Sequence, residues 1–278
     1  MPLAREIDLD ALCVENPCDV LHVLGSFWPY STGSHESRMV KAFKESHPVG
    51  QFRPHISELC EFYAANVLRA VGSEKIDWVA RVLNSSECEL DPTRPQSLLV
   101  DSIARQAKAR AVTHVFFKSG PRPPMRTVGH LSGSEALRAR ARYAAQDLFA
   151  RPMDLGGTVL LIDDIMNTGA SARVYARALK RWAGARRVIC VNLAVTRFER
   201  GRDGWGRLAL DTSAIEGRPG MELVWLDGQG RFHSSRECGD ARSKSTELRF
   251  IAERKCSPCP VCFGEPKRRK WWRVWESS

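Results

Sequence analysis

The chain has 278 residues, of which 43% are hydrophobic, and it carries a formal net charge of +10 at pH 7. This length suits one large domain, or a main domain with a smaller one, and the apolar content suffices for a packed core. No apolar stretch approaches the roughly 20 residues that cross a bilayer, which excludes a membrane-spanning protein. The positive charge favours polyanionic partners such as nucleotides, nucleic acid or pyrophosphate.

The nine cysteines are odd in number and unevenly spread. Five of them are scattered through the main body, which indicates reduced thiols in a cytoplasmic protein. The other four gather near the C-terminus. Residues 1–10 are acidic and lack the apolar core of a signal peptide, so we expect no secretion signal.

Short apolar runs alternate with segments of helical periodicity along the first two thirds of the chain. The short runs predict strands at residues 21–27, 76–83, 114–117, 159–162 and 187–194. Apolar residues that recur every three or four positions predict helices at 36–46, 56–71, 95–108, 135–149 and 170–182. This alternation predicts an α/β fold with a mostly parallel sheet flanked by helices.

The segment 159–171 is the most informative part of the chain. Four apolar residues end in Asp163 and Asp164, and a short polar loop that contains Gly169 leads into a helix. Open α/β sheets bind ligands at the carboxyl ends of their strands. The helix N-terminus offers free N–H groups and a positive dipole end, and a glycine lets the backbone approach a phosphate closely. Two acids beside an anion site suit a ligand with both hydroxyls and a phosphate, such as a sugar phosphate.

This segment resembles the signature of the type I phosphoribosyltransferases, which bind 5-phosphoribosyl-1-pyrophosphate (PRPP). The resemblance implies that Asp163 and Asp164 contact the ribose hydroxyls and that the loop binds the 5-phosphate. The loop residues with this implied role are Asn167, Thr168, Gly169, Ala170 and Ser171. The family usually has Thr where this chain has Asn167.

Two other arrangements are open at this segment. In the first arrangement, one acid binds the ribose and the other supports the loop, because adjacent strand residues point to opposite faces. In the second, the segment is a buried strand that ends in an ordinary Asx turn.

The order of elements over residues 20–196 is similar to the ComF-like branch of this family, which is associated with DNA uptake in bacteria. The resemblance includes the opening apolar strand and a helix with two lysines after it. Residues 83–96 depart from the arginine- and asparagine-containing stretch of that branch. The cysteine cluster that such proteins carry at the N-terminus is missing from that end of this chain.

The resemblance implies displacement of pyrophosphate at C1 of the ribose by a nitrogen nucleophile, with Mg²⁺ held mainly by substrate oxygens and water. The turn with Ser85 and Ser86 is placed like the family's pyrophosphate loop; the alternative is a plain turn. Residues 118–126 are placed like the mobile loop that closes over the substrate; the alternative is a solvated basic loop. The cations of that segment are Lys118, Arg122 and Arg126.

The cysteine cluster is the second strongest local pattern. Cys256, Cys259 and Cys262 are spaced as in a metal knuckle. Zn²⁺ takes four ligands, and we expect Cys238 as the fourth, with His233 as its alternative. A structural zinc would stabilise a region that is short of core residues. An iron–sulfur cluster tolerates the same spacing, and a metal-free segment is the third alternative.

The last residues, 267–275, mix lysine and arginine with tryptophan. Such a tail binds nucleic acid through phosphates and base stacking, or packs its tryptophans on the main domain. We expect two regions: a phosphoribosyltransferase-like core with an N-terminal hood over 1–198, and a C-terminal extension over 199–278.

The leading hypothesis is a cytoplasmic enzyme that binds PRPP with Mg²⁺ and transfers ribose 5-phosphate to an unidentified nitrogenous acceptor, with release of pyrophosphate. The alternative is a non-catalytic PRPP- or nucleotide-binding protein that acts in DNA uptake, processing or defence. A third hypothesis makes the cysteine region a docking element for a protein partner, and a homo-oligomer is a further expectation.

Overall fold

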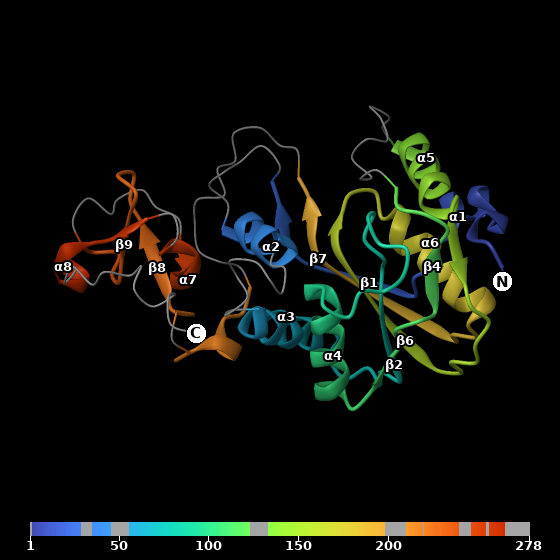
Figure 1. Cartoon of the computed structure of the whole chain (residues 1–278), viewed down its shortest axis with the longest axis horizontal. Helices are drawn as coiled ribbons and strands as arrows, with labels where there is room; N and C mark the ends of the chain where they lie inside the picture. The colour runs from blue at the N-terminus through green and yellow to red at the C-terminus, as the bar shows by residue number, and fades with distance from the viewer. Residues whose placement is uncertain are drawn as a thin grey trace, which may run out of the picture.

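The computed structural model describes residues 2–28, 35–45, 56–122, 133–197, 210–218, 220–238, 246–253 and 256–264. Its main sheet has five parallel strands in the order β1-β7-β6-β2-β3 (Figure 1). These strands are β1 (Val20–Phe27), β2 (Trp78–Arg81), β3 (Arg110–Ala111), β6 (Thr158–Met166) and β7 (Arg187–Thr196). The predicted fold class, a mostly parallel sheet flanked by helices, is confirmed.

Helices cover both faces of this sheet. The first layer consists of α2 (His35–Glu45), α3 (Ile56–Val71) and α4 (Pro95–Ala107). The second layer consists of α1 (Leu9–Val14), α5 (Gly133–Ala145) and α6 (Ala170–Trp182). Strand β6 alternates between the two layers, with Leu160 and Ile162 in the first apolar core and Val159 and Leu161 in the second. The continuous apolar run of the sequence therefore reflects burial on both faces.

A short antiparallel pair, β4 (Phe116–Lys118) and β5 (Leu148–Ala150), joins the second layer beside the short helix η1 (Ala4–Glu6). The prediction of one helix over 135–149 was wrong at its end, because α5 stops at Ala145 and β5 follows. Leu148 and Ala150 are buried on either side of Phe149, whose ring stacks on Phe117 with 4.9 Å between centroids. This period of two residues belongs to a strand.

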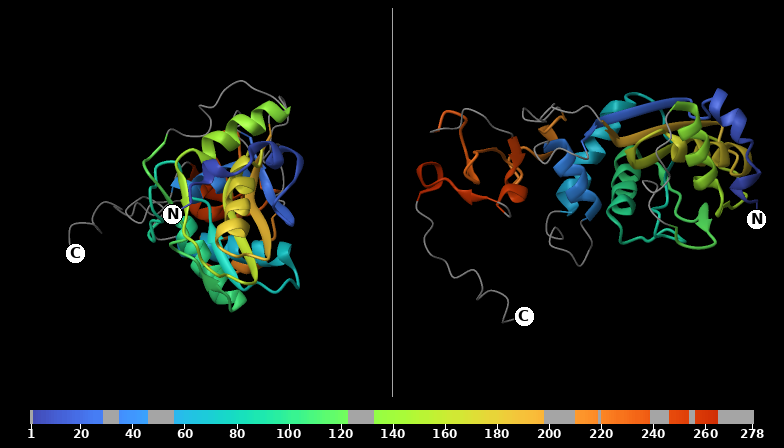
Figure 2. Two further views of the ribbon diagram at one scale, coloured as in Figure 1. Left: turned by 90° about the vertical axis from the view of Figure 1, so that its right-hand side faces the viewer. Right: turned by 90° about the horizontal axis from the view of Figure 1, so that it is seen from above.

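The C-terminal region forms a second sheet in the order β10-β8-β9-β11, at the end of the molecule remote from the N-terminus (Figure 2). Its elements are β8 (Leu223–Leu226), β9 (Arg231–His233), β10 (Thr246–Leu248), α7 (Arg249–Ala252), β11 (Ser257–Pro258) and α8 (Pro260–Phe263). Its own apolar cluster is small and centres on Val224, Leu226, Phe232 and Ala252. Such a core gives limited stability on its own.

The main domain and this second sheet are joined by packing and by charge. Leu248 on β10 and Phe250 on α7 belong to the apolar core that contains α3, as does Ile215 at the end of η4 (Ser213–Ile215). Arg38 on α2 forms an ion pair with the buried Glu247 on β10. The predicted boundary between 198 and 199 lies outside the described residues. None of the helices in the described ranges is long and apolar enough to cross a membrane.

Candidate functional site

The candidate site lies at the carboxyl end of β6, in the middle of the main sheet. From β2 the chain continues to β3 on one side, whereas β6 and β7 lie on the other side. The sheet order therefore reverses between β2 and β6, which is the place where open α/β sheets bind ligands. Arg81, the last residue of β2, pairs in register with Ile162, directly before the two acids. The tertiary fold thus puts the predicted acids at a topological switch point.

The two acids point into different layers. Asp164 contacts the first layer, where its Oδ2 lies 2.7 Å from Lys44 Nζ on α2 and accepts a 3.4 Å hydrogen bond from Gln96 Nε2 on α4. Asp163 lies on the face of Leu161 and α6, because side chains alternate along a strand. These contacts agree with the expectation that the side chains of Asp163 and Asp164 point to opposite faces of the sheet.

Asp163 is partly buried and accepts a 2.9 Å hydrogen bond at Oδ1 from the Asp164 N–H. Burial, together with the Asp164 charge, raises the pKa of Asp163 to about 7, against that hydrogen bond and the charges of Lys44 and Arg122, which lower it. Its carboxyl therefore changes protonation near neutral pH. Such perturbed groups concentrate at functional sites.

The loop after the acids leads into α6 through Gly169, whose φ is 75° and which occupies the N-cap of the helix without a side-chain cap. Within the described residues, the N–H groups of Ala170, Ser171 and Ala172 have no hydrogen-bond partner, as expected for a first helical turn. Asn167 is exposed, and Thr168 and Ser171 are half-buried. Free N–H groups at the positive end of a 13-residue helix therefore lie beside the acids, and such groups are donors suited to an anion.

We expect the Gly169→Ala variant to lose ligand affinity. A Cβ would meet Met166 Sδ at 3.6 Å, an ordinary contact, so the change acts through the positive φ. An L-residue there costs about 1–2 kcal/mol, which shifts the loop backbone and its N–H groups. Gly217→Ala is the matched control, because its φ is 74° and no heavy atom lies within 4 Å of the added carbon. Urea unfolding should show similar losses in both variants, and equal phosphate-ester affinity in both would contradict the role of the loop.

The loop after β2 is organised by a buried ion pair. The carboxylate of Glu87 accepts hydrogen bonds of 2.8 and 2.6 Å from the two terminal nitrogens of Arg81, and both side chains are at most 3% exposed. The Glu87 carboxylate also accepts hydrogen bonds from the backbone N–H groups of Asn84 and Asp91, at 2.6 and 3.2 Å. Burial acts to raise the pKa of Glu87, but the Arg81 and backbone hydrogen bonds outweigh it and lower the value. The buried Glu87 carboxylate therefore fixes the backbone of the turn that contains Ser85 and Ser86.

Two predicted residues of the next segment contact this same loop, Lys118 through its side chain and Arg122 through its backbone. Lys118 is buried, and its Nζ donates to the carbonyls of Asn84 and Ser85 at 2.6 and 2.9 Å. Burial, with the Arg122 charge, lowers the pKa of Lys118 to about 8. The backbone N–H of Arg122 donates to Ser85 O at 3.0 Å, and its side-chain Nη1 donates to Tyr143 O at 2.7 Å. Contact of these cations with a phosphate stays a prediction, and Arg126 lies outside the described residues.

Four residues of this corner were not predicted as part of the site: Lys44, Gln96, Arg81 and Glu87. In the sequence, Lys44 is one of two lysines on the helix after the first strand, and nothing local marks it as a partner of an acid. Arg81 lies inside the apolar run 76–83 and Glu87 follows six residues later, a spacing that has no local structural meaning. Their roles depend on a loop that folds back on its own strand.

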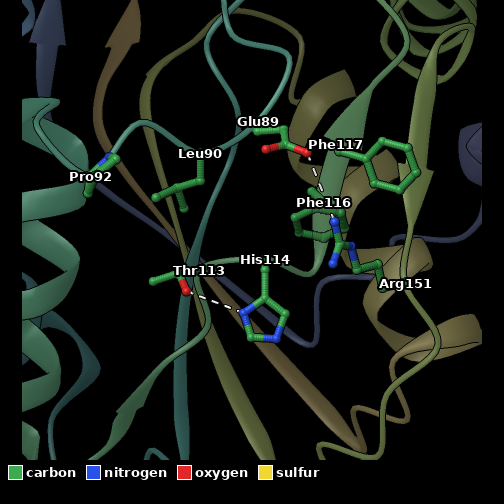
Figure 3. A pocket seen from close by; sticks show the side chains of 8 residues that line it. All are labelled: Glu89, Leu90, Pro92, Thr113, His114, Phe116, Phe117 and Arg151. Carbon is green, nitrogen blue, oxygen red and sulfur yellow. Dashed lines mark hydrogen bonds and ion pairs between the residues drawn. The ribbon is translucent and has the colours of Figure 1, made fainter.

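A pocket of about 320 Å³ lies next to this loop (Figure 3). Its lining combines apolar rings with an arginine and includes neither Asp163 nor Asp164. The lining residues are Glu89, Leu90, Pro92, Thr113, His114, Phe116, Phe117 and Arg151. The pocket is therefore not the corner that holds the acids.

A second site lies in the C-terminal region, where His233, Cys238, Cys259 and Cys262 bring one ligand atom each within 4.8 Å of one another. Cys238 Sγ and Cys259 Sγ are 3.9 Å apart, and Cys262 Sγ is 4.0 Å from His233 Nδ1. His233 Nε2 lies 3.0 Å from Asp227 Oδ2, which leaves Nδ1 facing the three thiols. A carboxylate behind a histidine is the usual second partner of a zinc ligand. This His/Cys₃ set could hold a metal such as Zn²⁺.

The cluster differs from the expected ligand set at one position: His233, the expected alternative to Cys238, joins Cys238, and Cys256 is not part of the group. Cys256 follows α7, donates its N–H to Ala252 O at 2.8 Å, and packs against the small apolar cluster. His233 ends β9, on the strand that pairs with β11 just before Cys259. The pairing of β9 with β11 therefore places His233 beside the cysteines, and the spacing of the cysteines alone does not indicate this.

We expect the purified protein to contain about one Zn²⁺ per chain, held by these four residues. His233→Ala should lose most of the metal, because three thiolates leave one position open. Cys256→Ser is the matched control and should retain it. Elemental analysis of protein purified without chelator measures both, and metal loss in the Cys256 variant alone would contradict the assignment.

No protein-family model matches the chain, and no curated protein matches it. Among solved structures, it is similar to adenine phosphoribosyltransferase from Saccharomyces cerevisiae complexed with D-2,5-dideoxy-2,5-imino-altritol 1,6-bisphosphate and adenine. The identity is 18%, the TM-score is 0.32, and the match covers 52% of this chain and 72% of that chain.

Proposed function

We propose that the chain is a phosphoribosyltransferase-like enzyme that binds PRPP and Mg²⁺ and transfers ribose 5-phosphate to a nitrogenous acceptor. One observation carries the proposal: two carboxylates and a glycine-capped helix N-terminus stand together at the switch point of the parallel sheet. A sugar phosphate has the matching groups, because its hydroxyls donate to carboxylates and its phosphate accepts from N–H groups.

The proposed roles follow from the charges at this corner. Asp163 and Asp164 accept hydrogen bonds from the ribose hydroxyls, and the loop from Asn167 to Ser171 holds the 5-phosphate. When C1 loses pyrophosphate, positive charge develops on the sugar, and nearby carboxylates stabilise it more in the transition state than in the ground state. The turn with Ser85 and Ser86 lies at the end of the neighbouring strand, where it would receive the pyrophosphate.

Mg²⁺ fits the negative charge at this corner. Among the described residues, Lys44 is the cation in direct contact with the pair of aspartates, so two carboxylates face one lysine. Oxygens of PRPP and water would hold it, while the two aspartates would bind the hydroxyls of the same sugar. Bound there, it would supply positive charge to the leaving pyrophosphate. The chain itself orients the sugar and fixes the two phosphate-binding loops.

The raised pKa of Asp163 predicts that PRPP affinity increases between about pH 6 and pH 8, by up to about tenfold per unit below the pKa. The free protein keeps the Asp163 proton up to about pH 7, whereas hydroxyls bind the carboxylate better, so binding releases a proton.

The raised pKa of Asp163 also affects the stability of the fold. Between about pH 4 and pH 7 this carboxyl holds a proton in the folded chain that it has lost in the unfolded chain. Asp163 therefore lowers the free energy of unfolding as the pH rises through that window.

Calorimetric titration in buffers of different ionisation enthalpy measures this proton release. Asp163→Asn should remove the pH dependence while leaving weaker binding. An affinity that does not change with pH in the unaltered protein would mean that Asp163 does not bind the ligand as a carboxylate.

The function itself is tested by two measurements on the full chain. Titration with PRPP and Mg²⁺ reports binding, and pyrophosphate release over a panel of purine, pyrimidine and pyridine bases reports transfer. Binding together with release in the presence of one base supports the enzyme. Absence of binding at millimolar PRPP would remove the proposal.

The arrangement of Lys118 and Arg122 favours a second candidate, a non-catalytic PRPP- or nucleotide-binding protein in a nucleic-acid pathway. Both side chains donate to backbone carbonyls, so they are less available to a pyrophosphate group. This candidate predicts PRPP binding without pyrophosphate release for any base. A gel shift with single-stranded DNA or RNA, with and without residues 265–278, tests the nucleic-acid part of the hypothesis.

A further inference from the structure

Asn192 is a fully buried polar residue without a partner. It lies on β7 with 0% of its surface exposed, and within the described residues neither its Oδ1 nor its Nδ2 has a hydrogen-bond partner. Nearly all buried side-chain amides in native proteins are hydrogen-bonded, so an unpaired one requires an explanation. The explanation must come from what lies beside it.

The residue beside Asn192 is Asp163. The two pair in register across the parallel strands β7 and β6. Their neighbours two residues earlier, Cys190 and Leu161, both belong to the apolar core of the α6 layer, so Asn192 and Asp163 share that face. Register neighbours on one face of a sheet lie close enough for their side chains to interact.

The other groups around Asp163 include charged side chains and one neutral hydroxyl, that of Tyr175, which is also buried without a hydrogen-bond partner within the described residues. Asp164 on β6, Lys44 on α2 and Arg122 on the loop after β4 act on it through charge. Tyr175 on α6 and Cys190 on β7 also interact with it electrostatically. Burial raises the pKa of Tyr175, and the pKa of Cys190 is raised by a hydrogen bond with Cys18 and by burial, so both are neutral. Among these neighbours, Asn192 alone brings a neutral amide with two unused N–H donors.

We propose that Asn192 is a positioning residue for Asp163: its amide donates to the ionised carboxylate, directly or through one buried water, and fixes its orientation. A side-chain rotation of Asn192, or a water between two or more polar groups, provides the contact. The proposal rests on the proposed function for the identity of the ligand, but the contact itself does not depend on it.

Carbon-13 NMR titration of the aspartate carboxyls in the ligand-free protein tests the contact, with the Asp163 signal assigned from the Asp163→Asn variant. Asn192→Leu keeps the branched shape and removes the donors, so the Asp163 midpoint should rise by about one pH unit. Asn192→Ser keeps a hydroxyl donor and should give a smaller rise. Val191→Ala is the control, because Val191 is buried on the same strand but faces the other layer.

An unchanged midpoint in Asn192→Leu overturns the proposal, as does an equal shift in Val191→Ala. If the leucine variant does not fold, the comparison of Asn192→Ser with the unaltered protein decides the question. A rise in the serine variant supports the contact, and no rise overturns it.

A second readout is the pH profile of PRPP binding. Asn192→Leu should bind PRPP about fivefold more weakly at pH 7, because a rise of the Asp163 pKa from about 7 to about 8 lowers the ionised fraction by that factor, and it should approach the unaltered protein near pH 9, where Asp163 is ionised in both. A merely structural defect would lower affinity equally at every pH, and that result would overturn the proposal. If the unaltered protein does not bind PRPP, the proposed function fails, while the NMR titration still decides the role of Asn192.

Discussion

Replacing Asp163 and Asp164 together with asparagine should abolish PRPP binding while the protein remains folded. Each hydrogen bond to a charged group contributes about 1.5–3 kcal/mol, so the loss of two lowers affinity by about 10²–10⁴-fold. The fold should survive because neither acid belongs to an apolar core and asparagine keeps the size of the side chain. Calorimetric titration with PRPP and Mg²⁺ measures the loss, and circular dichroism checks the fold.

The single variants separate the two roles. Asp164→Asn also removes the charge partner of Lys44, so it should weaken binding at every pH. Asp163→Asn should weaken it mainly above pH 7, where that carboxyl is ionised in the unaltered protein. Asp101→Asn, on the exposed face of α4, makes the same change of charge away from the corner and should bind normally. Unaltered affinity in the double variant would show that the ligand binds elsewhere.

The part of the site that lies within one stretch of sequence could be predicted. Strand β6, its acids and the start of α6 are consecutive, and burial on both faces leaves a plain apolar run ahead of polar residues. Helices α3 and α6 begin and end at the predicted residues, because each has a regular apolar stripe. Local pattern and tertiary fold agree at these elements.

The parts built from distant residues could not be predicted. Arg81 and Glu87 meet because the loop after β2 turns back. His233 was expected only as an alternative to Cys238, and it joins Cys238 in the cluster because β9 pairs with β11. Asn192 lies inside an apolar run and appears there as one polar interruption. Its importance depends on its position opposite Asp163 on β6, and that pairing is visible only in the folded sheet.

The second large effect that we expect concerns the ion pair between Arg81 and Glu87. Glu87→Gln should lower the free energy of unfolding by about 3–5 kcal/mol, because it leaves the Arg81 guanidinium, 1% exposed, without an opposite charge. Glu74→Gln is the matched control: it removes the partner of Arg187 in a pair whose side chains are 41% and 40% exposed. Such exposed pairs contribute about 0–1 kcal/mol. Urea unfolding measures both variants, and equal losses would contradict the burial argument.

A double variant distinguishes the stability of the fold from the shape of the loop. Arg81→Met with Glu87→Leu removes both buried charges, and apolar replacements of a buried ion pair are often neutral or stabilising, so much of the lost stability should return. The N–H groups of Asn84 and Asp91 then lack the carboxylate that accepts them, and the turn with Ser85 and Ser86 loses its internal support. PRPP affinity should therefore remain low in the double variant although its unfolding transition recovers. Recovery of both together would mean that Arg81 and Glu87 serve stability alone, and that the loop after β2 does not need their hydrogen bonds to bind the ligand.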